Sequence, residues 1–170
     1  MSLMVELRPE AGPALVVGGG TVAERKVRGL LEARFRVTVV APEIGEAIRA
    51  AGVECRVRSF EARDIAGHAI VFACTDSREV NHAVGEAARA AGVLVVVADS
   101  QEESTFFTPA VHRDGDLVVA VSTGGASPAL ARDIRDRIAA ALGAGWDERV
   151  RVARSERQER LARAGGDGDE

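Results

Sequence analysis

The sequence predicts an α/β protein: a Rossmann-like parallel sheet with helices on both faces, followed by a small hairpin-plus-helix region. Three observations lead to this prediction. Short apolar segments alternate with segments whose apolar residues recur every three or four positions. The short segments, such as 14–17 and 93–98, are apolar at every position, and strands that are apolar on both sides are typical of parallel sheets buried between helices. A run of three glycines, residues 18–20, separates the first strand from the first helix.

Strands are expected at 14–17, 36–41, 54–58, 69–74 and 93–98, each a short segment bounded by polar residues or glycine. Helices are expected at 21–33, 44–51 and 80–91, where apolar residues fall on one helical face. Parallel strands joined by helices require right-handed crossovers. These elements form the first predicted domain, residues 1–103.

The alternation ends near residue 103. Phe106–Arg113 and Leu117–Ser122 read as two strands of a hairpin, because Asp114-Gly115-Asp116 between them is a turn signal. A helix then begins at Ser127, a natural N-cap, and carries Leu130, Ile134, Ile138 and Leu142 at every fourth position. Residues 104–143 are the second predicted region, to which the family resemblance described below assigns a role in dimerisation and substrate binding. A charged helix over 146–163 and a disordered tail over 164–170 make up the third region, residues 144–170.

Composition narrows the classes of partner. The net charge of -4 comes from 22 basic and 26 acidic residues that are interleaved, so neither a nucleic-acid footprint nor a basic membrane-binding face is expected. No apolar run approaches the about 20 residues of a spanning helix, and the first nine residues do not resemble a secretory signal. Cys55 and Cys74 are expected to be buried free thiols in a reducing compartment, which indicates a cytoplasmic protein. The three histidines lack metal-ligand spacing, so no metal site is predicted.

The glycine run fits a dinucleotide-binding turn. Gly18, Gly20 and Ala23 match the pattern G-x-G-x-x-G/A, in which the first glycine makes the turn and the second lets the backbone approach a pyrophosphate. The amide groups at the start of the following helix would then face the phosphates. A merely flexible turn would have a similar sequence, but the strand before it and the helix after it favour the nucleotide.

Glu43, after the second strand, indicates which nucleotide binds. An acid at this place binds the adenosine ribose 2′-hydroxyl, whereas a 2′-phosphate needs a nearby arginine. No Lys or Arg occurs between Thr38 and Ala47, so NAD is favoured over NADP. The alternative is that Glu43 is simply the solvated start of the next helix.

Ligands of open parallel sheets bind outside the carboxyl ends of the strands. Thr75 and Asp76 follow the fourth strand, and Asp99 follows the fifth. Asp99 emerges from a nearly continuous apolar strand, where a carboxylate can accept or donate a proton next to the nicotinamide. The alternative is an aspartate that only caps a loop.

Several of these segments together resemble the precorrin-2 dehydrogenase part of sirohaem synthases. The resemblance covers residues 3–143 and lies in five motifs: V-G-G-G-T-V-A-E-R-K at 17–26, C-T-D at 74–76 with Asn81, V-V-A-D at 96–99, F-T-P-A at 107–110, and V-S-T-G-G-A-S-P-A-L-A at 121–131. The first and last motifs in combination are characteristic of that family.

This resemblance implies NAD-dependent oxidation of precorrin-2 to sirohydrochlorin with Asp99 as the catalytic aspartate. It places NAD contacts at Thr21, Val22, Pro42 and Glu43, and Thr75 is assigned to the same cofactor site. The substrate carries several carboxylates, which the helix start at Ser127, with Arg132 and Arg135 beyond it, would receive. Those arginines have an alternative role as the polar face of the helix. The family's members form homodimers, so an isologous homodimer is expected.

The chain departs from the family pattern at three places. Val96 stands where the family commonly has Asn, Arg34-Phe35 replaces a Gly-containing turn, and one charged helix follows residue 143 where relatives have a longer helical domain. Many relatives also insert iron into sirohydrochlorin, so the resemblance leaves this as an alternative activity, although a shorter helical region would weaken the tetrapyrrole site. No methyltransferase module is expected. A module that senses NAD or tetrapyrrole without catalysis is the third alternative.

Overall fold

A computed structural model describes residues 3–166 of the chain, with side chains as far as residue 163. The chain divides into two compact units, the first ending at Phe107 and the second beginning at Thr108. The three functional regions expected from the sequence remain a prediction. In the part described, no helix is long and apolar enough to cross a membrane.

The first unit is built on a five-stranded sheet in which every neighbouring pair is parallel. The strand order is β3-β2-β1-β4-β5, so the order reverses next to β1. The predicted parallel Rossmann-like sheet is thereby confirmed. The strands are β1 (Ala14–Val17), β2 (Val37–Ala41), β3 (Glu54–Val57), β4 (Ile70–Ala73) and β5 (Leu94–Val97).

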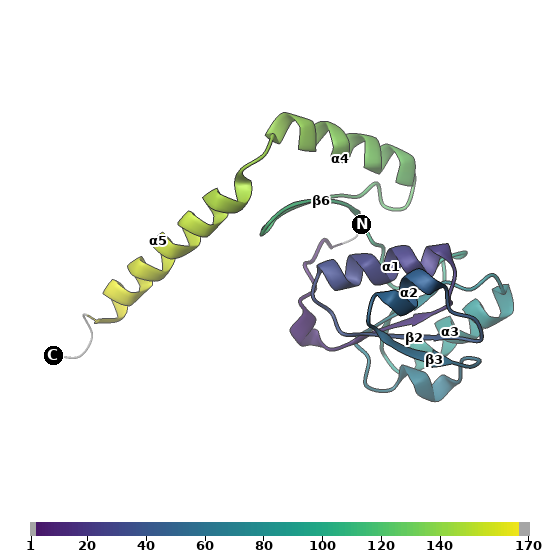
Figure 1. The fold of residues 1–170 in the computed structure, drawn as a ribbon. Helices are drawn as coiled ribbons and strands as arrows, with labels where there is room; N and C mark the ends of the chain where they lie inside the picture. The colour runs from purple at the N-terminus through teal and green to yellow at the C-terminus, as the bar shows by residue number, and fades with distance from the viewer. Residues whose placement is uncertain (1–2, 167–170) are drawn as a thin grey trace. The chain divides into compact units, whose positions relative to one another are not determined.

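Helices cover both faces of this sheet (Figure 1). Residues of α1 (Thr21–Glu32) and α2 (Glu46–Ala50) share one buried cluster with Val16, Val39 and Phe72. Residues of α3 (Arg78–Ala90) and the 3-10 helix η2 (Ala62–Ile65) share the other with Leu15 and Val71. Alternate strand residues thus enter opposite clusters, as the pleat of a sheet requires. A further 3-10 helix, η1 (Pro9–Ala11), precedes β1.

The loop after β5 covers the outer edge of that strand. The Val95 N–H donates to Thr105 Oγ1 at 2.8 Å, and the Thr105 N–H donates to the Val95 carbonyl at the same distance. The Val97 N–H donates to Ser104 Oγ at 2.9 Å. These bonds satisfy groups that an edge strand would otherwise expose. They also fix the path of the chain directly after Asp99.

The second unit begins with an antiparallel pair, β6 (Ala110–Asp114) and β7 (Leu117–Val121). The hairpin is confirmed, but the expectation that its first strand starts at Phe106 is wrong. Phe106 instead packs edge-on against Phe72 of the first unit's core, with ring centroids 5.8 Å apart. Pro109 has no N–H to donate to a strand ladder, so pairing starts only at Ala110.

Two helices follow the hairpin, α4 (Pro128–Leu142) and α5 (Trp146–Gly166). Ser127 caps α4 as predicted, because its Oγ accepts from the Leu130 N–H. The start of α5 is tied to the hairpin, since the Trp146 N–H donates to Asp114 Oδ2 at 2.8 Å. The prediction of a disordered tail is wrong for residues 164–166, because α5 continues through them. Residues 167–170 lie outside the described part.

The most buried charge in the first unit belongs to Asp64, which is 3% exposed. Two hydrogen bonds from Arg58, of 2.7 and 2.5 Å, and one from the Glu61 N–H meet its carboxylate. The hydrogen bonds from Arg58 are the main reason that the pKa of Asp64 falls to about 2. This network joins β3 to η2 at the edge of the sheet.

Asp64→Asn should lower the free energy of unfolding at pH 7 by about 2 kcal/mol, because the variant loses charge-assisted hydrogen bonds at a buried site. The carboxylate stabilises the fold fully above its ordinary pKa of 3.8 and loses this effect as the pH falls through about 2. Urea unfolding of wild type and variant at several pH values should show the gap closing over that range. Asp133→Asn, at an exposed ion pair on α4, is the control and should change stability little.

Candidate nucleotide and active site

Gly18 makes the sharp turn at the end of β1. Its φ of +128° favours glycine, and a Cβ built there would lie 2.4 Å from the Cys74 carbonyl oxygen. The Gly18 N–H donates to the Val40 carbonyl at 3.0 Å. The turn therefore lies closely against the ends of both strands that neighbour β1, and a larger residue would push them apart.

Gly19 also has no room for a side chain, although the motif allows any residue at this position. A Cβ at Gly19 would lie 1.9 Å from the Glu43 carbonyl oxygen, and the Gly45 N–H donates to the Gly19 carbonyl at 2.9 Å. This contact locks the glycine turn to the segment between β2 and α2. Sequence reasoning missed the role of Gly19, and the only signal for it was the uninterrupted run of three glycines.

Gly20 differs from both neighbours, since a Cβ added to it would meet nothing within 4 Å. It is the N-cap of α1 and offers no side chain to the helix amides, whereas Ser77 caps α3 and Ser127 caps α4. The first-turn N–H groups, at Thr21 and Val22, thus face a space that holds no capping side chain. An uncapped helix start behind an open glycine fits a bound pyrophosphate.

Pro42 and Glu43 are exposed in the turn after β2. The backbone contact between Glu43 and Gly19 holds this turn beside the glycine run. The two segments predicted to bind NAD are therefore adjacent in space. An exposed carboxylate on a turn that contacts the glycine run fits a ribose hydroxyl.

Thr75 follows β4, and its hydroxyl group is hydrogen-bonded within the protein. Its hydroxyl lies 2.8 Å from Asn81 Oδ1 and 3.0 Å from the Ser77 carbonyl, and the Thr75 N–H donates to Asn81 Oδ1 at 3.0 Å. The Asn81 side chain, fully buried, also donates to the Thr75 carbonyl. Asn81 thus holds the turn between β4 and α3 in shape, and the hydroxyl, N–H and carbonyl groups of Thr75 are all hydrogen-bonded within the protein.

Lys26 and Cys74 lie together behind the glycine turn, on the face of the sheet that α1 covers. The Lys26 ammonium stands 5.3 Å from the centre of the Phe72 ring, and burial lowers its pKa. Burial also raises the pKa of the Cys74 thiol to about 11. Cys74 is therefore a neutral core residue at ordinary pH, as the sequence predicts, and not a nucleophile.

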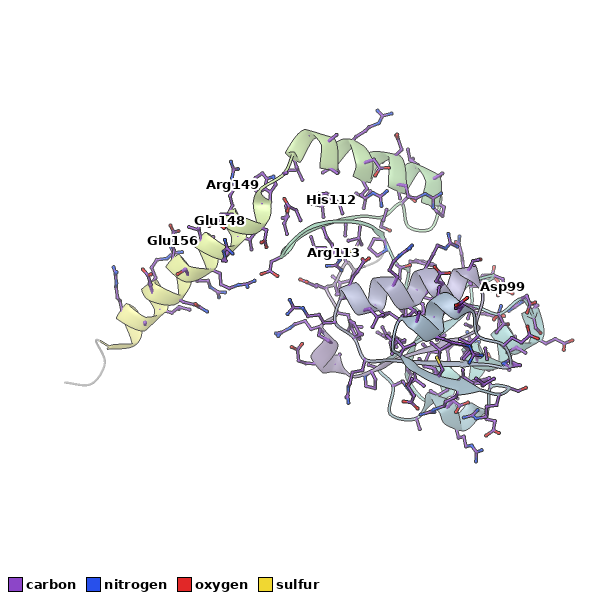
Figure 2. All side chains as sticks on the ribbon, viewed as in Figure 1. Asp99, His112, Arg113, Glu148, Arg149 and Glu156 are labelled. Carbon is purple, nitrogen blue, oxygen red and sulfur yellow. The ribbon has the colours of Figure 1, made fainter. Side chains whose placement is uncertain are left out.

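Asp99 stands two residues after β5, at the same carboxyl edge of the sheet as the glycine turn (Figure 2). Its side chain is 38% exposed, and its Oδ1 lies 3.6 Å from Arg78 Nη1. The apolar strand before Asp99 predicted apolar surroundings for its carboxylate, but the structure places the Arg78 guanidinium beside it. The reason is topological: α3 starts after β4, the neighbour of β5, and brings Arg78 to this edge.

A second carboxylate, Glu103, completes the cluster. Its Oε1 accepts from Arg78 Nη2 and lies 3.0 Å from His82 Nδ1. Hydrogen bonds from Arg78, and then from His82, lower the pKa of Glu103 to about 2. Neither Arg78 nor Glu103 was predicted as a site residue, because they are 25 positions apart and match no motif.

The predicted substrate residues belong to the second unit. Ser127 is the N-cap of α4, and Arg132 is exposed one turn along that helix. Arg135 is half-buried, and its Nη1 donates to the Val111 carbonyl at 3.3 Å while Nε donates to Asp136. Arg135 therefore ties α4 to β6, and Arg132 is the more accessible guanidinium.

Comparison with known proteins agrees with this geometry. Residues 5–110 match the family described as "Putative NAD(P)-binding", and residues 114–141 match "Sirohaem biosynthesis protein central". The chain belongs to the family described as "Putative NAD(P)-binding". Its cofactor is accordingly a nicotinamide dinucleotide.

Similar proteins include the siroheme synthases of Gluconacetobacter diazotrophicus, 38% identical over 89% of this chain, and Methylobacillus flagellatus, 44% identical over 74%. This chain spans only 34% and 28% of those two proteins, about a third of their length. Among solved structures, "SirC, precorrin-2 dehydrogenase" matches with a TM-score of 0.69 and 27% identity, over 89% of this chain and 75% of that one.

The glycine turn allows a matched pair of variants. Gly20→Ala places its Cβ in open space at a φ of -90°, so it should unfold at the wild-type temperature yet bind NAD+ at least about tenfold more weakly, because the methyl group meets the pyrophosphate. Gly19→Ala must displace the Glu43 backbone and should lose both thermal stability and NAD+ binding.

Thermal unfolding and titration calorimetry with NAD+ measure the two effects. Full-strength NAD+ binding by Gly20→Ala would contradict the placement of the pyrophosphate at this turn.

Proposed function

We propose that this chain catalyses the NAD-dependent dehydrogenation of precorrin-2 to sirohydrochlorin. The observation that carries the proposal is the presence of a carboxylate, Asp99, at the same sheet edge as a turn that fits a dinucleotide pyrophosphate. The similarity in fold to a precorrin-2 dehydrogenase supports the choice of substrate.

In the proposed reaction, NAD+ supplies the acceptor for the hydride that leaves a tetrapyrrole carbon. The chain's own residues bind the cofactor, orient the substrate and take up the proton. Amide groups of Thr21 and Val22 hold the pyrophosphate, and Glu43 accepts a hydrogen bond from the ribose 2′-hydroxyl. The Asp99 carboxylate accepts the proton that the tetrapyrrole loses, and an exposed carboxylate can pass it to water.

NAD rather than NADP is the proposed cofactor. Glu43 would repel a 2′-phosphate, and the turn it occupies contains no basic residue. Pro42 keeps this turn rigid, and the contact of Glu43 with Gly19 fixes its distance from the pyrophosphate site.

Ser127 and Arg132 are proposed to receive substrate carboxylates at the start of α4. Arg132 is exposed, and the Ser127 hydroxyl, which accepts from the helix, still has its own proton to donate. Arg135 contributes by holding α4 on the hairpin.

The second unit is proposed to be the dimer interface. Within its described residues, Ala131 is the only buried side chain, and every residue of β6 and β7 keeps some exposure. A two-stranded sheet with so thin a core needs a partner surface for stability. The cytoplasmic location, and partners that include neither nucleic acid nor membrane, remain predictions from composition.

Asp99→Asn should reduce turnover by about 10²- to 10⁴-fold, because the amide cannot accept a proton, while NAD+ affinity stays near wild type. The assay is anaerobic, with precorrin-2, NAD+ and no added metal, and follows NADH and the sirohydrochlorin spectrum. Glu79→Gln, at an exposed carboxylate on α3, is the control.

Wild-type NAD+ binding without turnover would contradict the enzyme and favour the sensing role. Insertion of Fe²⁺ or Co²⁺ into sirohydrochlorin without NAD+ would add the chelatase activity.

Sedimentation velocity should give twice the chain mass of 17.9 kDa for wild type. Leu130 is 50% exposed on α4, so Leu130→Glu should leave the fold intact and weaken the dimer at least about tenfold by placing a charge in the interface. Leu31→Glu, at a leucine 38% exposed on α1 of the first unit, is the matched control. A wild-type monomer at micromolar concentration would refute the proposed interface.

A further inference from the structure

We propose that Arg78 binds a carboxylate of the substrate, and that Glu103 holds its guanidinium back from Asp99 so that both groups stay available to the substrate. The proposal rests on the dehydrogenase function proposed above, and adds to it a binding residue and the residue that orients it.

Arg78 is shared unequally between two carboxylates, Glu103 and Asp99. Arg78 Nη2 hydrogen-bonds to Glu103 Oε1, whereas Nη1 stays 3.6 Å from Asp99 Oδ1, beyond hydrogen-bond distance. The catalytic candidate therefore has a positive charge nearby without giving its oxygens to a hydrogen bond. Its proton-accepting oxygens remain unoccupied by the arginine.

Several hydrogen bonds hold Glu103 in place beside Arg78. Its side chain is only 18% exposed, and His82 Nδ1 approaches the same Oε1 atom at 3.0 Å. Arg89 Nη1 donates to the Glu103 carbonyl at 2.6 Å, and the next residue, Ser104, is bonded to β5. The hydrogen bonds that lower the pKa of Glu103 to about 2 keep it charged at every working pH.

Arg78 has N–H donors that its hydrogen bond to Glu103 does not use. A guanidinium carries five N–H groups, and Glu103 takes a hydrogen bond from one of the two terminal nitrogens. The Arg78 side chain is 49% exposed, beside Asp99 at the carboxyl edge of the sheet. A half-exposed arginine of fixed orientation is suited to a carboxylate ligand, and the proposed substrate carries several.

The geometry also defines the consequence of losing Glu103. Glutamine has the same size but no charge, and the nearest remaining carboxylate to Arg78 is then Asp99. A small rotation of the guanidinium would convert the 3.6 Å approach into a hydrogen-bonded pair. Asp99 would then be occupied, although it is itself unchanged.

Three variants test this arrangement through kcat and KM for precorrin-2 at saturating NAD+. Arg78→Met should raise KM about tenfold and keep kcat within about twofold, since a binding contact is lost and Asp99 is untouched. Glu103→Gln should lower kcat about tenfold or more, because Arg78 moves onto Asp99. The double variant should recover the kcat of Arg78→Met and keep its raised KM. Glu79→Gln, an exposed neighbour on α3, should behave as wild type.

Recovery of kcat in the double variant would show that Glu103 acts by orienting Arg78. If Glu103 only stabilised its loop, adding Arg78→Met to Glu103→Gln would lower kcat further or leave it low. A double variant no faster than Glu103→Gln, or an unchanged KM in Arg78→Met, would overturn the proposal while wild-type turnover still supports the dehydrogenase.

Binding of sirohydrochlorin without NAD+, followed by its absorbance, gives a second readout that needs no turnover. Arg78→Met should bind it about tenfold more weakly than wild type. If wild type binds sirohydrochlorin but never forms NADH, weaker binding by Arg78→Met supports the carboxylate contact and rejects the enzyme. Equal binding by wild type and Arg78→Met rejects the carboxylate contact.

Discussion

The glycine turn after β1 is the contact on which the site depends. Gly18 touches the backbone after β4, and Gly19 touches the backbone after β2, at distances that leave no room for a side chain. Three strand ends are thereby held together at the point where the strand order reverses. The uncapped start of α1 and the exposed Glu43 take their places from this packing. Ligands of open parallel sheets bind at such a point because neighbouring loops diverge there and leave a crevice.

The acidic half of the site is built by different means. Asp99 and Glu103 belong to one loop, which the hydroxyl groups of Ser104 and Thr105 fasten along the edge of β5. Arg78 approaches from α3, whose first turn is held by the buried Asn81 and by the Ser77 cap. Each charged group therefore stands on a backbone fixed by hydrogen bonds, which is the condition for precise placement of reacting groups.

The two units are stabilised in contrasting ways. The first has a dense apolar core on each face of its sheet, so it can keep exposed, charged groups at one edge without losing its fold. The second has a single buried residue among those described, and its cohesion comes from polar links such as Trp146 to Asp114 and Arg135 to Val111. A unit of this kind is suited to association, because its apolar residues are still partly accessible.

The sequence by itself determined the parallel sheet, the glycine turn after β1 and the capped helix at Ser127, because these depend on local patterns: apolar strands, a glycine run and an N-cap. It could not show that Gly19 is as constrained as Gly18, that the Thr75 hydroxyl is already used by Asn81, or that Phe106 belongs to the core instead of a strand. Only the tertiary structure brought Arg78 and Glu103 to Asp99, since strand order, and not sequence distance, decides which loops meet at one edge of a sheet.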